Sequence, residues 1–242
     1  MSAQPDHNTA RAAARASGDP AHLLDVATLR QFVGAPVAIS VLEDAADRAV
    51  ASGRVLEDTL ILGPEGAGKQ LVARALARDA AQRIVEVDAA WPRNAKHLAR
   101  IVRSLEDRDA LVLRRVDELR PASLRMLVSL MGMRTLPRDA DGGVPMADCT
   151  VIATAVGVPR RAAVLRRMFP LRVELPAPSA ESVTAAAYRA AQALGAAGTP
   201  ELRAALAERV LAHAASTPGA GTTGNLLDCC MIARIAMTRG LT

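Results

Sequence analysis

Short apolar runs alternate with helical patterns along the middle of the chain. The runs lie at residues 59–62, 83–87, 110–113, 149–153 and 171–175. Apolar residues at helical spacing fill residues 69–82, 94–105, 121–131 and 160–168. Short continuous apolar strands separated by helices are typical of a parallel sheet that is covered on both faces. The pattern therefore predicts an α/β fold with a five-stranded parallel sheet and helices on both faces.

The ends of the chain have a different pattern. Residues 1–22 mix Pro, Gly and Ser with little apolar periodicity, which predicts a mobile tail. Pro176 and Pro178 end the α/β pattern, and the remainder is helical in pattern. We expect a tail at 1–22, an α/β core at 23–177 and a small helical domain at 178–242.

Composition narrows the class of protein. Half of the 242 residues are apolar and 23% are charged, which excludes a largely disordered chain. Only 2% are aromatic, which argues against single-strand binding by base stacking. A net charge of +5 permits an acidic partner such as nucleic acid. Three cysteines make no disulfide framework, and no apolar run reaches the ~18 residues of a membrane helix, so we expect a cytoplasmic protein without membrane contact.

A glycine-rich loop joins the first predicted strand to its helix. It reads Gly63-Pro64-Glu65-Gly66-Ala67-Gly68-Lys69-Gln70 and fits the phosphate-loop pattern G-x-x-x-x-G-K-[ST] at every position except the last. Glycines let backbone amides converge on phosphate oxygens, and the lysine would reach the β- and γ-phosphates. We assign nucleotide binding to Gly63, Pro64, Glu65, Gly66, Ala67, Gly68, Lys69, Gln70 and Leu71. Gln70 stands where a Ser or Thr hydroxyl would ligate Mg²⁺, and nucleotide binding survives this change more easily than hydrolysis does.

With this loop in place, the chain resembles an AAA+ module of the RuvB type, the Holliday-junction branch-migration motors. The resemblance covers roughly residues 25–235. It rests on Phe32-Val33-Gly34, the approach to the third strand at 104–111, the strand segment Thr150-Val151-Ile152-Ala153-Thr154, the segment Leu165-Arg166-Arg167-Met168-Phe169 and the lid segment Gly221-Thr222-Thr223-Gly224-Asn225-Leu226-Leu227. It implies ATP as the cofactor and a ring or partner assembly, because nucleotide sites of this class lie between subunits. The sequence ends before the family's winged-helix domain, so we expect any DNA contact to be made through a partner.

A second resemblance is to the bacterial enhancer-binding transcription activators. It rests on Gly68-Lys69-Gln70-Leu71-Val72-Ala73-Arg74-Ala75 and on Leu119-Arg120-Pro121-Ala122-Ser123-Leu124. Those activators also lack a hydroxyl after the loop lysine. No counterpart of their loop that engages the polymerase sigma factor is found, so this resemblance ranks second.

The family's Asp-Glu pair, which holds Mg²⁺ and orients the attacking water, has two possible counterparts. Asp117 and Glu118 are one choice, but that register places Arg114 and Arg115 inside a buried strand, at a cost of several kcal/mol each. We favour the register in which the strand ends at Leu113 and the two arginines replace the carboxylates at its tip. Arg114 then either contacts a phosphate directly in place of the metal or points to solvent.

Other expected positions also depart from the family pattern. Thr154 is a substitute for the polar residue that reads the γ-phosphate, or a buried strand threonine. Gly219 or Gly224 occupies the place of the lid arginine, and Arg166 is the candidate arginine finger. We therefore expect a RuvB-like module that binds ATP, hydrolyses it weakly or not at all, and acts as a subunit or regulator of a DNA-associated AAA+ assembly. Two alternatives remain: an active branch-migration helicase subunit that uses Asp117, Glu118 and Arg166, and a transcription regulatory module.

Overall fold

The computed structural model describes residues 26–81, 83–88, 95–136, 144–157, 163–193, 196 and 198–216. Its elements, in chain order, are the 3₁₀ turn η2 (Leu29–Gln31), α2 (Pro36–Ser52), β1 (Thr59–Leu62), α3 (Lys69–Ala80), β2 (Ile84–Asp88), α4 (Ala95–Arg103), β3 (Ala110–Arg114), the 3₁₀ turn η3 (Val116–Glu118), α5 (Pro121–Met133), β4 (Thr135–Leu136), β5 (Val144–Pro145), β6 (Thr150–Ala155), α6 (Ala163–Met168), β7 (Leu171–Glu174), α7 (Ala180–Ala193) and α8 (Pro200–Ser216).

The main sheet has five strands in the order β2-β3-β6-β1-β7, and every neighbouring pair is parallel. This confirms the predicted α/β class. Two strands run one residue further than their apolar runs, because β2 ends at Asp88 and β3 at Arg114. These two residues are partners in the strand register, so the oppositely charged side chains support each other across the pair.

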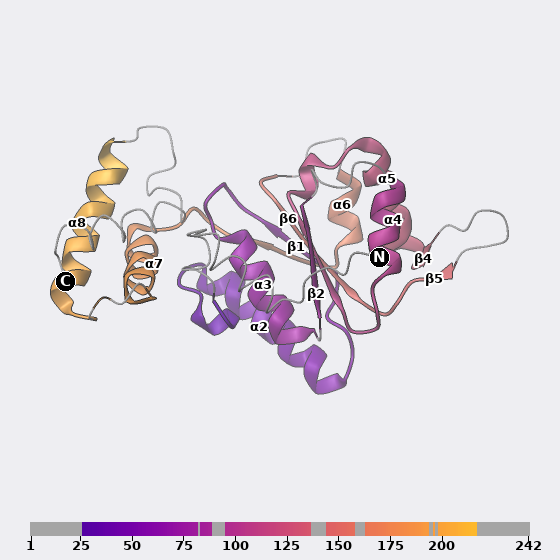
Figure 1. Cartoon of the computed structure of the whole chain (residues 1–242), viewed down its shortest axis with the longest axis horizontal. Helices are drawn as coiled ribbons and strands as arrows, with labels where there is room; N and C mark the ends of the chain where they lie inside the picture. The colour runs from indigo at the N-terminus through magenta and orange to yellow at the C-terminus, as the bar shows by residue number, and fades with distance from the viewer. Residues whose placement is uncertain are drawn as a thin grey trace.

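Helices cover both faces of the sheet, with α2 and α3 on one side and α4, α5 and α6 on the other (Figure 1). Strand alternation sorts the core residues: Leu111 and Leu113 of β3 face the α4–α6 layer, whereas Val112 faces the α2–α3 layer. Arg114 follows Val112 by two residues and therefore lies on the α3 side. Glu86 and Asp88 of β2, which alternate with Val85 and Val87, lie on the same side.

Helices α7 and α8 pack together beyond β7 and have an apolar core of their own, built from residues such as Val183, Ala187 and Leu206. Leu71 of α3 packs against both this core and the α2–α3 core, so the helix that follows the phosphate loop contacts the helical pair directly. The domain boundary at residue 178 stays a prediction.

Strands β4 and β5 form a separate antiparallel pair between α5 and β6. Several sequence features lie outside the described residues: the tail at 1–22, Arg160, Arg161, Gly219 and the expected lid segment at 221–227. Among the described helices, none is both long enough and apolar enough to cross a membrane.

Candidate functional site

The phosphate loop lies between β1 and α3, at the carboxyl edge of the sheet. Gly66 and Gly68 have φ values of 75° and 81°, in the left-handed region that glycine adopts without strain. At Gly63 the φ is 152°, and an added Cβ would lie 2.6 Å from the carbonyl oxygen of Leu175. The three glycines of the motif are therefore required by backbone shape and by the close approach of the chain that leaves β7.

Lys69 is the first residue of α3, and its ammonium folds back onto the loop. Its Nζ donates to the carbonyl oxygens of Gly63 at 2.8 Å and Pro64 at 2.6 Å. Burial lowers the pKa of Lys69, while the charges of Asp117 and Glu65 oppose that shift. Gly68 caps α3 without a side-chain hydrogen bond, and the first amides of a helix have no intrahelical acceptor. The loop thus offers an ammonium and helix-start amides to an anion.

A cavity of about 470 Å³ adjoins the loop. Ala67 of the loop contributes to its wall, together with the residues around η2 and the start of α7: Phe32, Val33, Gly34, Ala35, Pro36, Pro176, Ala177, Pro178, Ser179, Glu181 and Ser182. Phe32-Val33-Gly34 was predicted only as part of the family resemblance, and the α7 residues of the cavity were not predicted. The one available signal was the pair Pro176 and Pro178, which follow β7 and line the cavity.

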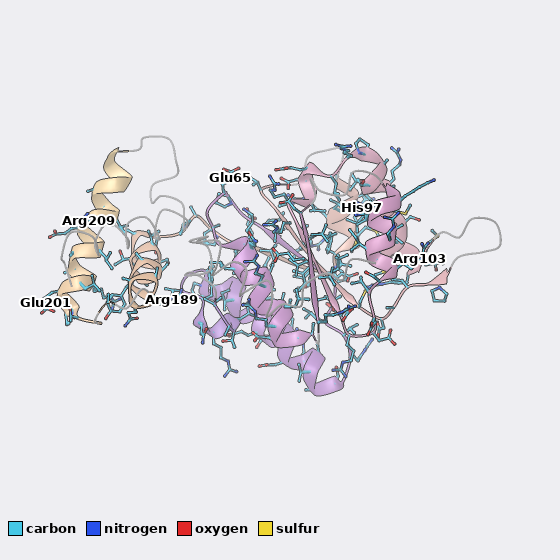
Figure 2. All side chains as sticks on the ribbon, in the orientation of Figure 1. Glu65, His97, Arg103, Arg189, Glu201 and Arg209 are labelled. Carbon is cyan, nitrogen blue, oxygen red and sulfur yellow. The ribbon has the colours of Figure 1, made fainter. Side chains whose placement is uncertain are left out.

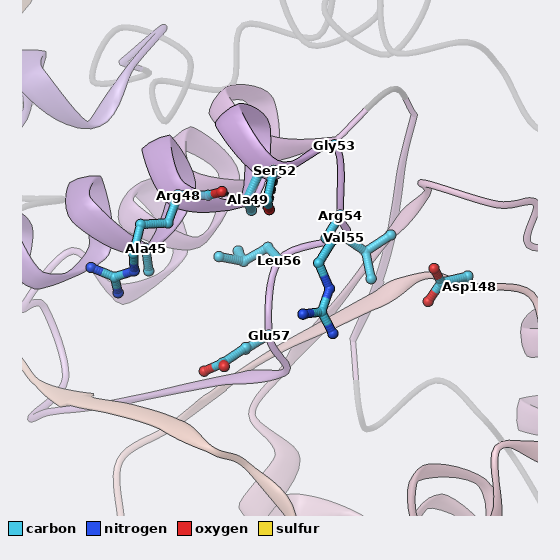
Figure 3. Close-up of a pocket in the computed structure, with 10 residues that line it drawn as sticks. All are labelled: Ala45, Arg48, Ala49, Ser52, Gly53, Arg54, Val55, Leu56, Glu57 and Asp148. Carbon is cyan, nitrogen blue, oxygen red and sulfur yellow. Dashed lines mark hydrogen bonds between the residues drawn. The ribbon is translucent and has the colours of Figure 1, made fainter.

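A second cavity, of about 450 Å³, lies at the opposite edge of the sheet (Figure 3). Leu56 and Glu57 before β1 and Asp148 before β6 line it, with Arg48 and Arg54. These are the amino ends of the strands, so this cavity is separate from the phosphate loop.

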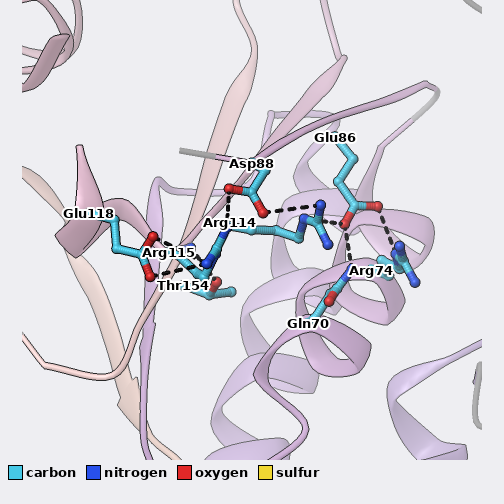
Figure 4. Close-up of polar contacts among 8 residues, drawn as sticks. All are labelled: Gln70, Arg74, Glu86, Asp88, Arg114, Arg115, Glu118 and Thr154. Carbon is cyan, nitrogen blue, oxygen red and sulfur yellow. Dashed lines mark hydrogen bonds and ion pairs between the residues drawn. The ribbon is translucent and has the colours of Figure 1, made fainter. Parts of the chain in front are cut away.

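An ion-pair network occupies the region where a phosphate-loop enzyme would hold its metal (Figure 4). Glu86 accepts hydrogen bonds from Gln70 Nε2 at 2.8 Å and Arg74 Nε at 2.7 Å. Arg114 Nε lies 3.2 Å from Glu86 Oε1, outside hydrogen-bonding geometry, and Arg114 Nη2 lies 3.3 Å from Asp88 Oδ2. Glu86 therefore connects Gln70, which stands where the phosphate-loop pattern has Ser or Thr, with Arg114 at the end of β3.

Arg115 extends the network beyond the strand. It has a left-handed backbone with φ of 55°, and its guanidinium contacts Asp88 at 2.7 Å and Glu118 at 3.2 Å. Its backbone amide donates to Thr154 Oγ1 at 3.2 Å. Thr154 is buried and supports this turn, which is the second of the two interpretations given to it above.

Asp117 and Glu118 lie in the turn η3, after the strand rather than in it. Asp117 Oδ2 accepts from the amide of Val156 at 3.3 Å, whereas Asp117 Oδ1 is buried and has no hydrogen-bond partner. Glu118 is exposed and paired with Arg115. The two carboxylates are therefore in different environments.

Arg166 lies on α6 with an exposed side chain, and its carbonyl oxygen accepts from Arg172. It is on the face of the sheet that is opposite to α3. The structure does not bring Arg166 together with the loop of its own chain.

The residues at the loop fit a nucleotide. The glycine cradle, the Lys69 ammonium and the helix start suit phosphates, and the adjoining cavity has room for the rest of the molecule. They do not fit Mg²⁺ at the usual place, because Gln70 is bonded to Glu86 and a guanidinium stands where a carboxylate is needed. Among the described residues, no three His, Cys, Asp or Glu side chains gather in an arrangement that could hold a metal ion.

Solved structures of other proteins share the fold that surrounds this loop. No protein-family model matches the sequence. The Holliday junction branch migration motor RuvB from Thermotoga maritima superposes with a TM-score of 0.65 at 20% identity, covering 88% of this chain and 73% of that one. NtrX from Brucella abortus, solved in complex with ADP, superposes with a TM-score of 0.59 at 18% identity, covering 96% of this chain and 55% of that one. At these identities the likeness concerns the fold, and the fold of this chain is that of the AAA+ P-loop ATPases.

Proposed function

We propose that this chain is a nucleotide-binding AAA+ module that hydrolyses ATP poorly or not at all. The observation that carries the proposal is the pairing of Gln70 and Arg114 with Glu86 beside an otherwise regular phosphate loop. The loop supplies binding, and the network removes the metal site on which hydrolysis depends.

Binding relies on backbone shape more than on side chains. The φ values of Gly66 and Gly68 set the loop, and Lys69 exchanges its two carbonyl contacts for phosphate oxygens. A direct contact of Arg114 with a phosphate, one of the two alternatives given above, would require an ion pair with Glu86 or Asp88 to open. We therefore assign the phosphates to the loop and Lys69, and a positioning role to Arg114.

Loss of hydrolysis follows from charge. The network matches three guanidinium groups, Arg74, Arg114 and Arg115, with three carboxylates, Glu86, Asp88 and Glu118. A divalent cation entering there would meet arginine, and its carboxylate ligands would have to leave their partners. Glu118 is held by Arg115, so it does not orient a water at the loop.

We further propose that the module works inside an AAA+ assembly associated with DNA. The superposed RuvB is a Holliday junction branch migration motor. The resemblance to its family implies nucleotide sites that lie between subunits. Exposed Arg166 would then face a neighbouring subunit rather than its own loop. The net charge of +5 is compatible with a nucleic-acid partner in that assembly.

The test combines binding with turnover. Wild-type protein and Lys69→Met are titrated with ADP by calorimetry, and inorganic phosphate release from ATP is measured with and without Mg²⁺ and DNA. We expect ADP binding that Lys69→Met abolishes, and no phosphate release above background. Sustained release that DNA stimulates would contradict the proposal.

One observation favours an active ATPase as the second candidate. Asp117 Oδ1 is buried without a hydrogen-bond partner, and Asp117 interacts electrostatically with Lys69. An unpaired carboxylate oxygen of this kind is a possible metal ligand. That function requires Glu118 to leave Arg115 and activate water. Glu118→Gln would then abolish phosphate release, whereas the first candidate expects this variant to be silent.

A further inference from the structure

The carboxyl ends of three neighbouring strands meet at the phosphate loop. Strand β6 lies between β1 and β3 in the sheet. The loop follows β1, Val156 follows β6, and Asp117 follows β3 in the turn η3, which contacts β6. The side chain of Asp117 is therefore positioned at the same edge as Lys69.

Asp117 is fixed there. Its Oδ2 accepts from the amide of Val156 at 3.3 Å, which anchors the carboxylate over the end of β6. Its Oδ1 is buried and has no hydrogen-bond partner. Asp117 and Glu65 both interact electrostatically with the Lys69 ammonium. Because a phosphate-loop lysine reaches the β- and γ-phosphates, a carboxylate beside it lies near the place of the third phosphate.

The neighbouring cations are already matched. Arg74 pairs with Glu86, Arg114 with Glu86 and Asp88, and Arg115 with Asp88 and Glu118. A third phosphate would bring further negative charge against Asp117, while these guanidinium groups are held by their carboxylates. The first two phosphates would be bound by the loop glycines, the start of α3 and Lys69.

We propose that this site selects a nucleoside diphosphate over a triphosphate, because the Asp117 carboxylate stands where the third phosphate would lie. The inference rests on the proposed nucleotide binding and narrows its ligand class. Asp117 acts here as an electrostatic substitute for the third phosphate, so the diphosphate completes the site without a metal.

The deciding experiment compares ADP with the β,γ-imido analogue of ATP by calorimetry on the full chain, in EDTA. We expect the wild type to bind ADP at least about tenfold more tightly. Equal affinities, or tighter binding of the analogue, would overturn the inference without any variant. Binding of neither nucleotide would instead contradict the proposed function.

Two variants identify the group responsible. Asp117→Asn keeps the shape and removes the charge, and it should bring the ratio of the two affinities towards one, mainly by improving binding of the analogue. Glu57→Gln removes an exposed charge at the opposite edge of the sheet, and it should leave the ratio unchanged. If Glu57→Gln lowers the ratio as much as Asp117→Asn, the selectivity is a general charge effect and Asp117 has no special position.

A repetition with Mg²⁺ tests the competing role of Asp117 as a cation ligand. The inference expects ADP to remain the preferred ligand. If Mg²⁺ raises the affinity for the analogue above that for ADP in the wild type but not in Asp117→Asn, then Asp117 holds a cation, and the inference is overturned.

Discussion

At the scale of residues, the site is defined by which charges are matched. Glu86 contacts Gln70, Arg74 and Arg114, and side-chain exposures of 33% for Arg114 and 23% for Glu86 keep this contact partly shielded from water. Sequence analysis identified Gln70 and Arg114 as departures from the family pattern. It missed Glu86, because nothing in one sequence relates position 86 to a residue 16 positions earlier.

Removing Arg114 tests the network. Arg114→Ala leaves Asp88 and Glu86 each without one cation, and we expect the free energy of unfolding to fall by about 1–2 kcal/mol, moderated by partial exposure. Chemical denaturation measures the change. Arg125→Ala, an exposed arginine on α5, is the control and should change stability by less than about 0.5 kcal/mol. Equal effects in the two variants would mean that the network contributes nothing.

The ionisation of Lys69 predicts how the affinity for ADP depends on pH. Burial lowers its pKa from the usual 10.5, so the charged form that a phosphate needs is lost at a lower pH than for an ordinary lysine. We expect ADP affinity to be complete near neutral pH and to decline as the pH rises through this lowered pKa. Lys69→Arg keeps its charge throughout, so its affinity should be flat over the same range. A wild-type affinity that is also flat up to pH 10.5 would contradict this assignment.

At the scale of elements, the sheet was predictable and its edge was not. Apolar runs located all five strands of the main sheet, because buried parallel strands are apolar on both faces. The apolar runs ended before Asp88 and Arg114, because a charged residue after a strand is normally interpreted as part of a loop. Only the structure shows that these two residues are cross-strand partners. No apolar run indicated the short pair β4–β5, because two-residue strands carry no periodicity.

The loop can be tested with two glycines. Gly63→Ala would place a Cβ 2.6 Å from the Leu175 carbonyl oxygen, so we expect a loss of about 2–4 kcal/mol and weaker ADP binding. Gly53 also has a positive φ, of 67°, but an added Cβ there meets nothing within 4 Å. Gly53→Ala should therefore show backbone strain alone, about 1 kcal/mol. Thermal melts that give equal losses would show that the close approach has no effect.

At the scale of the whole molecule, the cavity beside the phosphate loop lies between the α/β core and the helical pair. Phe32 and Pro36 line one side, and Glu181 and Ser182 of α7 line the other. Arg189, also on α7, donates to the carbonyl oxygen of Gln31, and it projects towards the core (Figure 2). Burial lowers the pKa of Arg189. No local sequence pattern indicated this contact, because it joins residues 158 positions apart.

This contact should influence binding from outside the cavity. Arg189→Ala frees α7 from η2, so we expect the affinity for ADP to fall about fivefold to tenfold through the entropy of an unfixed wall. Arg203→Ala, exposed on α8, is the matched control and should bind as the wild type does. Calorimetry on both variants measures the affinities. Identical values would mean that Arg189 has no influence on ADP binding.

The most direct test of a metal-independent nucleotide site is the ratio of ADP affinities with and without Mg²⁺ in the wild type. Guanidinium groups matched by Glu86 and Asp88 leave no place for the cation, so the ratio should stay within about twofold of one. A hundredfold gain with Mg²⁺ would mean that a metal enters the site, and the account of Arg114 would be wrong.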